Sequence, residues 1–97
     1  MMLLTKAIME KLPPMYSTDG QGMEAMAQVK FFITWADWTW YMSEYDPKSR
    51  QCFGLVSSPY ARELGYWNMD DLEYIHNGYL EVERDKTWMP KKLNDCA

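Results

Sequence analysis

The sequence predicts an α+β fold: a small antiparallel β-sheet, made of a three-stranded meander and one late strand, with two short helices. Its 97 residues suffice for one domain, spanning residues 1–97, with a single modest core. The composition, 47% hydrophobic and 25% charged, is typical of a folded globular chain. Apolar residues at helical spacing flank a central stretch rich in β-branched and aromatic residues, so helices and strands are segregated along the chain.

The first helix is predicted over residues 3–12. Leu4, Ile8 and Leu12 recur at helical spacing, and Thr5 is suited to cap the N-terminus. Pro13-Pro14 ends the helix, because proline lacks the backbone donor and disfavours helix in the residue before it. The loop that follows, residues 17–22, is rich in Ser, Thr, Asp and Gly.

The central stretch predicts three strands in succession, at residues 27–33, 38–45 and 52–56. Turns around Ala36 and Pro47 join them into two hairpins and hence a meander. Alternation in the second strand places Trp38, Trp40 and Met42 on one face of the sheet.

The last third of the chain is predicted to hold one helix and one strand. Residues 59–65 are expected to form an irregular link that follows the meander, and Tyr66-Trp67 can adopt an extended conformation. Asn68 is expected to cap the helix, which has acidic residues in its first turn and ends at Asn77-Gly78. The final strand is predicted over residues 79–88.

Two cysteines, Cys52 and Cys96, stand 44 positions apart. A disulfide scaffold would be much denser in cysteine, so we expect two unpaired thiols. The chain also lacks a cleavable signal and any apolar run near the roughly 20 residues of a membrane span. We therefore expect a cytoplasmic protein that does not contact the membrane.

Catalytic and metal-binding motifs do not emerge from the sequence. His76 is the one histidine, no serine lies in a GxSxG motif, and Cys52, His76 and Cys96 lack zinc-site spacing. We expect no enzymatic activity, no metal and no cofactor. A small hydrolase built around Cys52 and His76 is kept as an alternative.

Charge is distributed unevenly along the chain. The formal net charge is −4, and residues 63–85 hold seven acids against the single base Arg84. Nucleic-acid-binding proteins usually show the opposite, a basic stripe. A partner recognised by charge should therefore be a basic protein surface. The candidate binding residues are the seven acids of this segment: Glu63, Asp70, Asp71, Glu73, Glu81, Glu83 and Asp85.

Three of these acids, Glu81, Glu83 and Asp85, alternate along the predicted last strand. Residues on one face of a strand repeat every ~6.6–6.8 Å, close to the roughly 6–7 Å between successive phosphates of one nucleic-acid strand. The spacing is compatible with an imitation of DNA, but by itself the alternation favours an ordinary solvated strand face, on which period-2 charge is common. The aromatic residues of the central stretch are expected mainly to pack in the core and the hairpin. Any rings left exposed, around Trp35 and Trp38, form a second candidate interface, because exposed aromatic rings can anchor a protein partner.

Seven segments that follow one another along nearly the whole chain resemble those of one protein family. They are residues 3–6, 11–18, 28–32, 38–41, 53–56, 63–66 and 83–85. The family they resemble consists of small bacterial proteins that carry a "domain of unknown function" label and travel on plasmids, integrative elements and prophages. The resemblance brings no assigned catalytic residues.

Length, charge and this resemblance together are similar to those of phage anti-CRISPR proteins that mimic DNA. The resemblance implies a non-enzymatic inhibitor for host-defence evasion, encoded by a phage or another mobile genetic element and acting in the host cytoplasm. It would bind the basic DNA-binding surface of a type I CRISPR surveillance complex, without contacting nucleic acid itself. The alternative is a plasmid or prophage accessory protein, antirestriction-like, that binds another partner.

Overall fold

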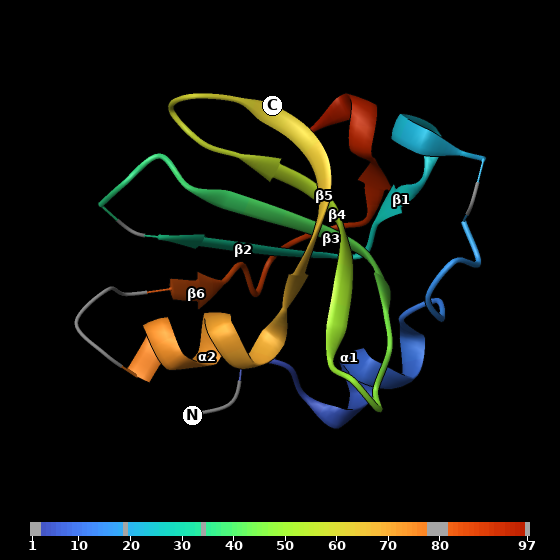
Figure 1. Ribbon diagram of the computed structural model, residues 1–97, viewed down its shortest axis with the longest axis horizontal. Coiled ribbons are helices and arrows are strands. Elements are labelled where there is room, and N and C mark those ends of the chain that lie inside the picture. Colours follow the sequence, from blue (N-terminus) through green and yellow to red (C-terminus); the bar gives the residue numbers. More distant parts are fainter. Residues whose placement is uncertain (1–2, 19, 34, 78–81, 97) are drawn as a thin grey trace.

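The computed structural model describes residues 3–18, 20–33, 35–77 and 82–96, with the side chains of residues 76 and 77 left out. This part of the chain forms two α-helices, two short 3₁₀ helices and seven strands (Figure 1). The helices are α1 (Lys6–Lys11) and α2 (Met69–Asn77), with 3₁₀ helices at Gly22–Glu24 and Leu93–Asp95. The strands are β1 (Met26–Ala27), β2 (Val29–Ile33), β3 (Thr39–Tyr45), β4 (Gln51–Ser57), β5 (Arg62–Asn68), β6 (Val82–Arg84) and β7 (Lys91–Lys92).

The main sheet has five antiparallel strands in the order β5-β4-β3-β2-β6. Strands β2 to β5 form a meander, and α2 then returns the chain to place β6 beside β2. The α+β architecture with an antiparallel sheet is confirmed. The predicted size was wrong, because the meander has four strands and a second, two-stranded sheet pairs β1 with β7.

Strand β5 forms where an irregular link was expected. Its seven residues pair along the whole of β4, from Ser57 opposite Arg62 to Gln51 opposite Asn68. The hairpin is closed by Ser58, whose backbone N–H donates to the Ala61 carbonyl at 2.8 Å. Charged residues and Gly65 lower the intrinsic β propensity of this segment, but pairing with a neighbouring strand overrides that preference.

Other element boundaries also differ from the predictions. Helix α1 starts at the predicted cap, with Thr5 Oγ1 accepting from the Ile8 N–H at 3.2 Å, but Leu3 and Leu4 precede the helix and lie in the core. The first predicted strand is divided at Gln28 into β1 and β2, which belong to different sheets. The last predicted strand is reduced to β6, and its residues 79–81 lie outside the described part, as does Gly78 at the predicted helix end.

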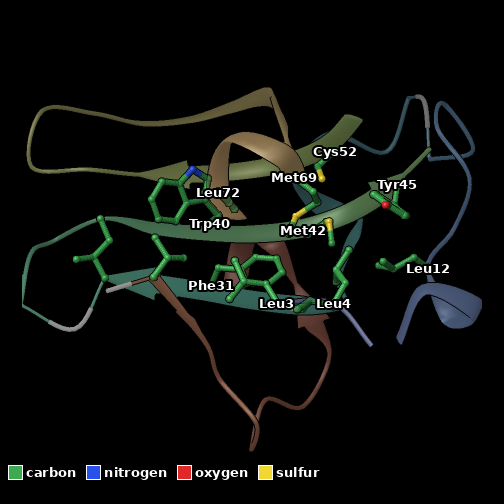
Figure 2. Packing of buried hydrophobic residues seen from close by; sticks show 13 residues of the cluster. Leu3, Leu4, Leu12, Phe31, Trp40, Met42, Tyr45, Cys52, Met69 and Leu72 are labelled. Carbon is green, nitrogen blue, oxygen red and sulfur yellow. The ribbon is translucent and has the colours of Figure 1, made fainter. Parts of the chain in front are cut away.

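One face of the main sheet, here called the helical face, carries the larger core. Phe31, Trp40 and Met42 from the strands meet Met69 and Leu72 from α2 (Figure 2). Leu3, Leu4 and Leu12 from the N-terminal segment complete this cluster. The predicted common face of Trp40 and Met42 is confirmed, and Trp38 packs against the same cluster from just before β3.

The opposite face, here called the second face, is covered by the β1–β7 sheet and the 3₁₀ helices. Tyr41 and Leu55 of the main sheet pack there against Ala27, Leu93 and Cys96. Strand β3 is therefore buried on both faces, and its residues Trp40 to Tyr45 are all buried. Among the described residues, no helix is long and apolar enough to cross a membrane.

Candidate functional site

Cys52 occupies a structural position in the core. It lies on β4 in the larger cluster, fully buried, and both cysteines are free, as predicted. Burial raises the pKa of the Cys52 thiol far above its ordinary value, so the thiolate that a nucleophile requires is not formed at neutral pH. The His76 side chain falls outside the described atoms. The geometry around Cys52 therefore gives no support to the hydrolase alternative.

We expect Cys52 to be unreactive in the folded protein. In a Cys96→Ser variant, which leaves Cys52 as the only thiol, 5,5′-dithiobis-(2-nitrobenzoic acid) at pH 8 should react only after denaturation in urea, because burial blocks both access and ionisation. Rapid reaction of the native variant would contradict the buried position and restore a reactive-cysteine role.

Metal-binding groups are not assembled in the part of the chain that the structure describes. No three side chains among its histidines, cysteines, aspartates and glutamates gather as a metal site would require.

Helix α2 carries three of the seven candidate acids at its N-terminal end. Asn68 Oδ1 accepts from the Asp70 N–H at 2.8 Å, as expected of a helix cap. Asp70 pairs with Arg50 at 2.6 Å, and Glu73 also pairs with this guanidinium. Asp71 is exposed, and no ion pair to it occurs among the described residues. Arg50 thus neutralises part of the helix charge and leaves Asp71 unpaired.

Glu83 and Asp85 lie at the opposite edge of the sheet from β5. Glu83 is in register with Phe32, so it projects to the second face, away from α2. Asp85 follows β6 and accepts from the Thr87 N–H at 3.0 Å and Oγ1 at 2.8 Å, and these bonds lower the pKa of its carboxyl group. Glu81 lies outside the described residues. Of the alternating row, Glu83 alone is a described strand residue with an exposed side chain.

Glu63 lies on β5, the other edge strand, and shares the helical face with Val56 and Trp40. Four strand spacings of about 4.8 Å separate the two edges, so β5 and β6 are roughly 19 Å apart. The structure therefore brings Glu63 onto the same face as α2 and separates both from Glu83. The described acids of residues 63–85 therefore lie on two surfaces instead of one row.

An aromatic groove lies on the helical face, between the β2–β3 hairpin and α2. It encloses about 360 Å³ and is lined by Ile33, Trp35, Ala36, Trp38, Trp40 and Ile75. Trp38 and Trp40 stack with ring centroids 5.9 Å apart and planes at 27°. Trp35 is 62% exposed, whereas Trp40 is buried. The suggestion from sequence that Trp35 and Trp38 are available at the surface agrees with this arrangement.

A second groove, of about 250 Å³, adjoins the first across Trp38. It runs along the β4–β5 hairpin and is lined by Trp38, Val56, Ser58, Ala61, Glu63, Leu64 and Gly65. Among the described residues that line the two grooves, Glu63 is the single charged one. We call the two grooves together the tryptophan surface. Sequence reasoning missed Ile75 and Val56 as partners of the tryptophans, because no local pattern shows that α2 and β4 meet the hairpin there.

The sequence matches one family model over most of its length. That model, described as "Protein of unknown function (DUF2958)", covers residues 3–93, so the chain belongs to the DUF2958 family. No curated protein and no solved structure matches the chain.

Proposed function

We propose that this protein is a non-enzymatic inhibitor from a phage or another mobile element, which binds the basic DNA-binding surface of a type I CRISPR surveillance complex. In the complex, carboxylates of this protein would occupy the sites at which the phosphates of target DNA otherwise bind. The observation that supports this best is that Asp70 and Asp71 on α2 lie on the same side of the sheet, the helical face, as Glu63 on β5.

Local balance of charge favours the helical side over the β6 edge. Near α2 and β5, Arg50 is the basic residue that pairs with the acids, and Asp71 and Glu63 are exposed and have no ion-pair partner among the described residues. At the β6 edge, Lys86 follows Asp85 in the chain, and the positive charge of Lys30 also acts on the Asp85 carboxylate. A basic groove would therefore be attracted more strongly to the α2 side.

Charge reversal on the α2 side should weaken binding sharply. We expect Glu63→Lys combined with Asp71→Lys to lower the affinity for a purified type I complex by about 100-fold, because like charges facing each other across an interface cost several kcal/mol. The matched control is Glu10→Lys with Asp95→Lys, two exposed positions elsewhere with the same total change in charge. Its affinity should fall by only about threefold, through weaker long-range attraction. Equal losses for the two double variants would contradict a local role for the α2 side.

Competition with DNA tests the mode of inhibition. A complex saturated with its double-stranded target DNA should fail to bind the protein. Without DNA, the rate at which the protein associates with the complex should fall as the salt concentration rises, because exposed charges are screened. Simultaneous binding of the DNA and the protein, or no binding of the protein to the complex at all, would overturn the proposal.

A further inference from the structure

The tryptophan surface has the composition of a protein-binding anchor. Trp35 stands 62% exposed at the tip of the β2–β3 hairpin, next to a groove whose six lining residues are all apolar. In Figure 1 this hairpin and the C-terminal end of α2 lie at the same end of the molecule. Tryptophan is enriched among the residues that carry most of the binding energy at protein interfaces. Trp40 belongs to the core cluster, whereas the exposed Trp35 ring contributes little buried area to it.

The aromatic rings on the two faces of the sheet differ in their cation–π contacts. On the second face, Lys30 Nζ lies 5.8 Å from the ring centroids of Phe32 and Trp88 and 5.9 Å from that of Tyr41. In the described part of the chain, no lysine or arginine lies over Trp35, Trp38 or Trp40. The rings of the groove are therefore free to receive a cation from another molecule.

Three acidic residues line the tryptophan surface or neighbour its lining residues in the chain, and we call their carboxylates its rim. Glu63 lines the adjoining groove beside Trp38, and Asp37 is exposed between Ala36 and Trp38 in the hairpin. Asp71 is exposed one helical turn before Ile75, a separation that places two side chains on the same side of a helix. An apolar, aromatic groove with a negative rim is complementary to a side chain that is both flat and positively charged.

We infer that the tryptophan surface anchors an arginine-bearing segment of the partner protein, with a guanidinium stacked on an indole ring and its charge facing the carboxylates of the rim. This inference rests on the proposed function for the identity of the partner. Arginine fits better than lysine, because its planar and weakly hydrated guanidinium stacks on aromatic faces and also pairs with carboxylates. Single-stranded nucleic acid, the other common ligand of exposed aromatic rings, needs a positive groove and would be repelled here.

The first experiment probes the groove without the partner. A capped peptide of alternating arginine and glycine is titrated into ¹⁵N-labelled protein, and the indole N–H signals are followed. We expect saturable shifts of the Trp35 and Trp38 signals, smaller shifts with lysine in place of arginine, and none with glutamate. Trp35→Ala should abolish the response of Trp38, whereas Tyr16→Ala, an aromatic residue of similar exposure elsewhere (59%), should leave it unchanged. Shifts that are absent, or equal for the glutamate peptide, would overturn the inference.

The second experiment separates this inference from the proposed function. Trp35→Ala should weaken binding to the type I complex by about 30-fold or more, the loss typical of an aromatic hot spot, and Tyr16→Ala should change it by less than about threefold. If the wild-type protein binds and Trp35→Ala binds equally well, the inference fails and the proposed function stands. If the wild-type protein does not bind while the peptide shifts are seen, the proposed function fails and the arginine anchor stands.

Discussion

Replacing Gly54 by alanine is expected to destabilise the protein by about 3 kcal/mol or more. A Cβ atom at this position would lie 1.9 Å from the Tyr41 carbonyl oxygen, 2.9 Å from its carbonyl carbon and 3.1 Å from Met42 Cα. All three are backbone atoms of the neighbouring strand β3, so no side-chain rotation relieves the clash. The central pair of strands would have to separate next to the β-bulge between Met42 and Glu44. Inserting an extra methylene group into a well-packed core typically costs about 1–3 kcal/mol, even where neighbouring groups shift to relieve the overlap.

Gly65 supplies the matched control, because it pairs directly with Gly54 across β4 and β5. A Cβ atom built there has no neighbour within 4 Å. Gly65→Ala should leave stability unchanged or raise it by about 0.4–1 kcal/mol, since alanine restricts the unfolded chain more than glycine does. Urea unfolding followed by circular dichroism measures both variants. Equal midpoints for the two would refute the close approach of β3 at Gly54.

Glu44→Ala is expected to lower the free energy of unfolding by about 3–5 kcal/mol. The Glu44 carboxylate is 2% exposed and accepts hydrogen bonds from the backbone N–H groups of Tyr16 and Thr18, each at 2.8 Å, and from the Thr18 hydroxyl. Hydrogen bonds to a charged group contribute about 1.5–3 kcal/mol each, and the alanine variant would remove the acceptor of three donors in the partly buried loop. Tyr16 also has a left-handed backbone conformation, φ 69°, which is unfavourable for a non-glycine residue and depends on these contacts.

Thr18→Val isolates one part of this network, because it removes the hydroxyl and keeps both backbone donors. Its cost should be about 1 kcal/mol. In native-state hydrogen exchange, the amides of Tyr16 and Thr18 should be protected in the wild type and exchange rapidly in Glu44→Ala. A Glu44→Ala variant within 1 kcal/mol of the wild type, with those amides still protected, would show that the loop is held by other contacts.

Local signals in the sequence predicted the parts of the fold that depend on neighbouring residues. Thr5 caps α1, and the turn after β3 forms around Pro47, with Asp46 Oδ1 accepting from the Lys48 N–H at 3.0 Å. Alternation placed Trp40 and Met42 together in the core. The same alternation failed beyond Met42, because the bulge shifts the register and β3 is covered on both faces. Glu44 was missed for that reason, since no local pattern indicates a buried carboxylate that binds a loop 26–28 residues away.

The α+β architecture, the free cysteines and the concentration of acids in residues 63–85 could all be predicted from the amino-acid sequence. Which of the described acids share a surface depends instead on strand pairing between segments far apart in the chain. Pairing of β5 with β4 places Glu63 on the helical face, while β6 aligns Glu83 with the second face at the opposite edge. The tryptophan surface also depends on the tertiary structure, because Ile33, Trp38 and Ile75 meet only when α2 packs across the sheet. Period and composition describe residues that are close in the chain, whereas register and packing join residues far apart in it.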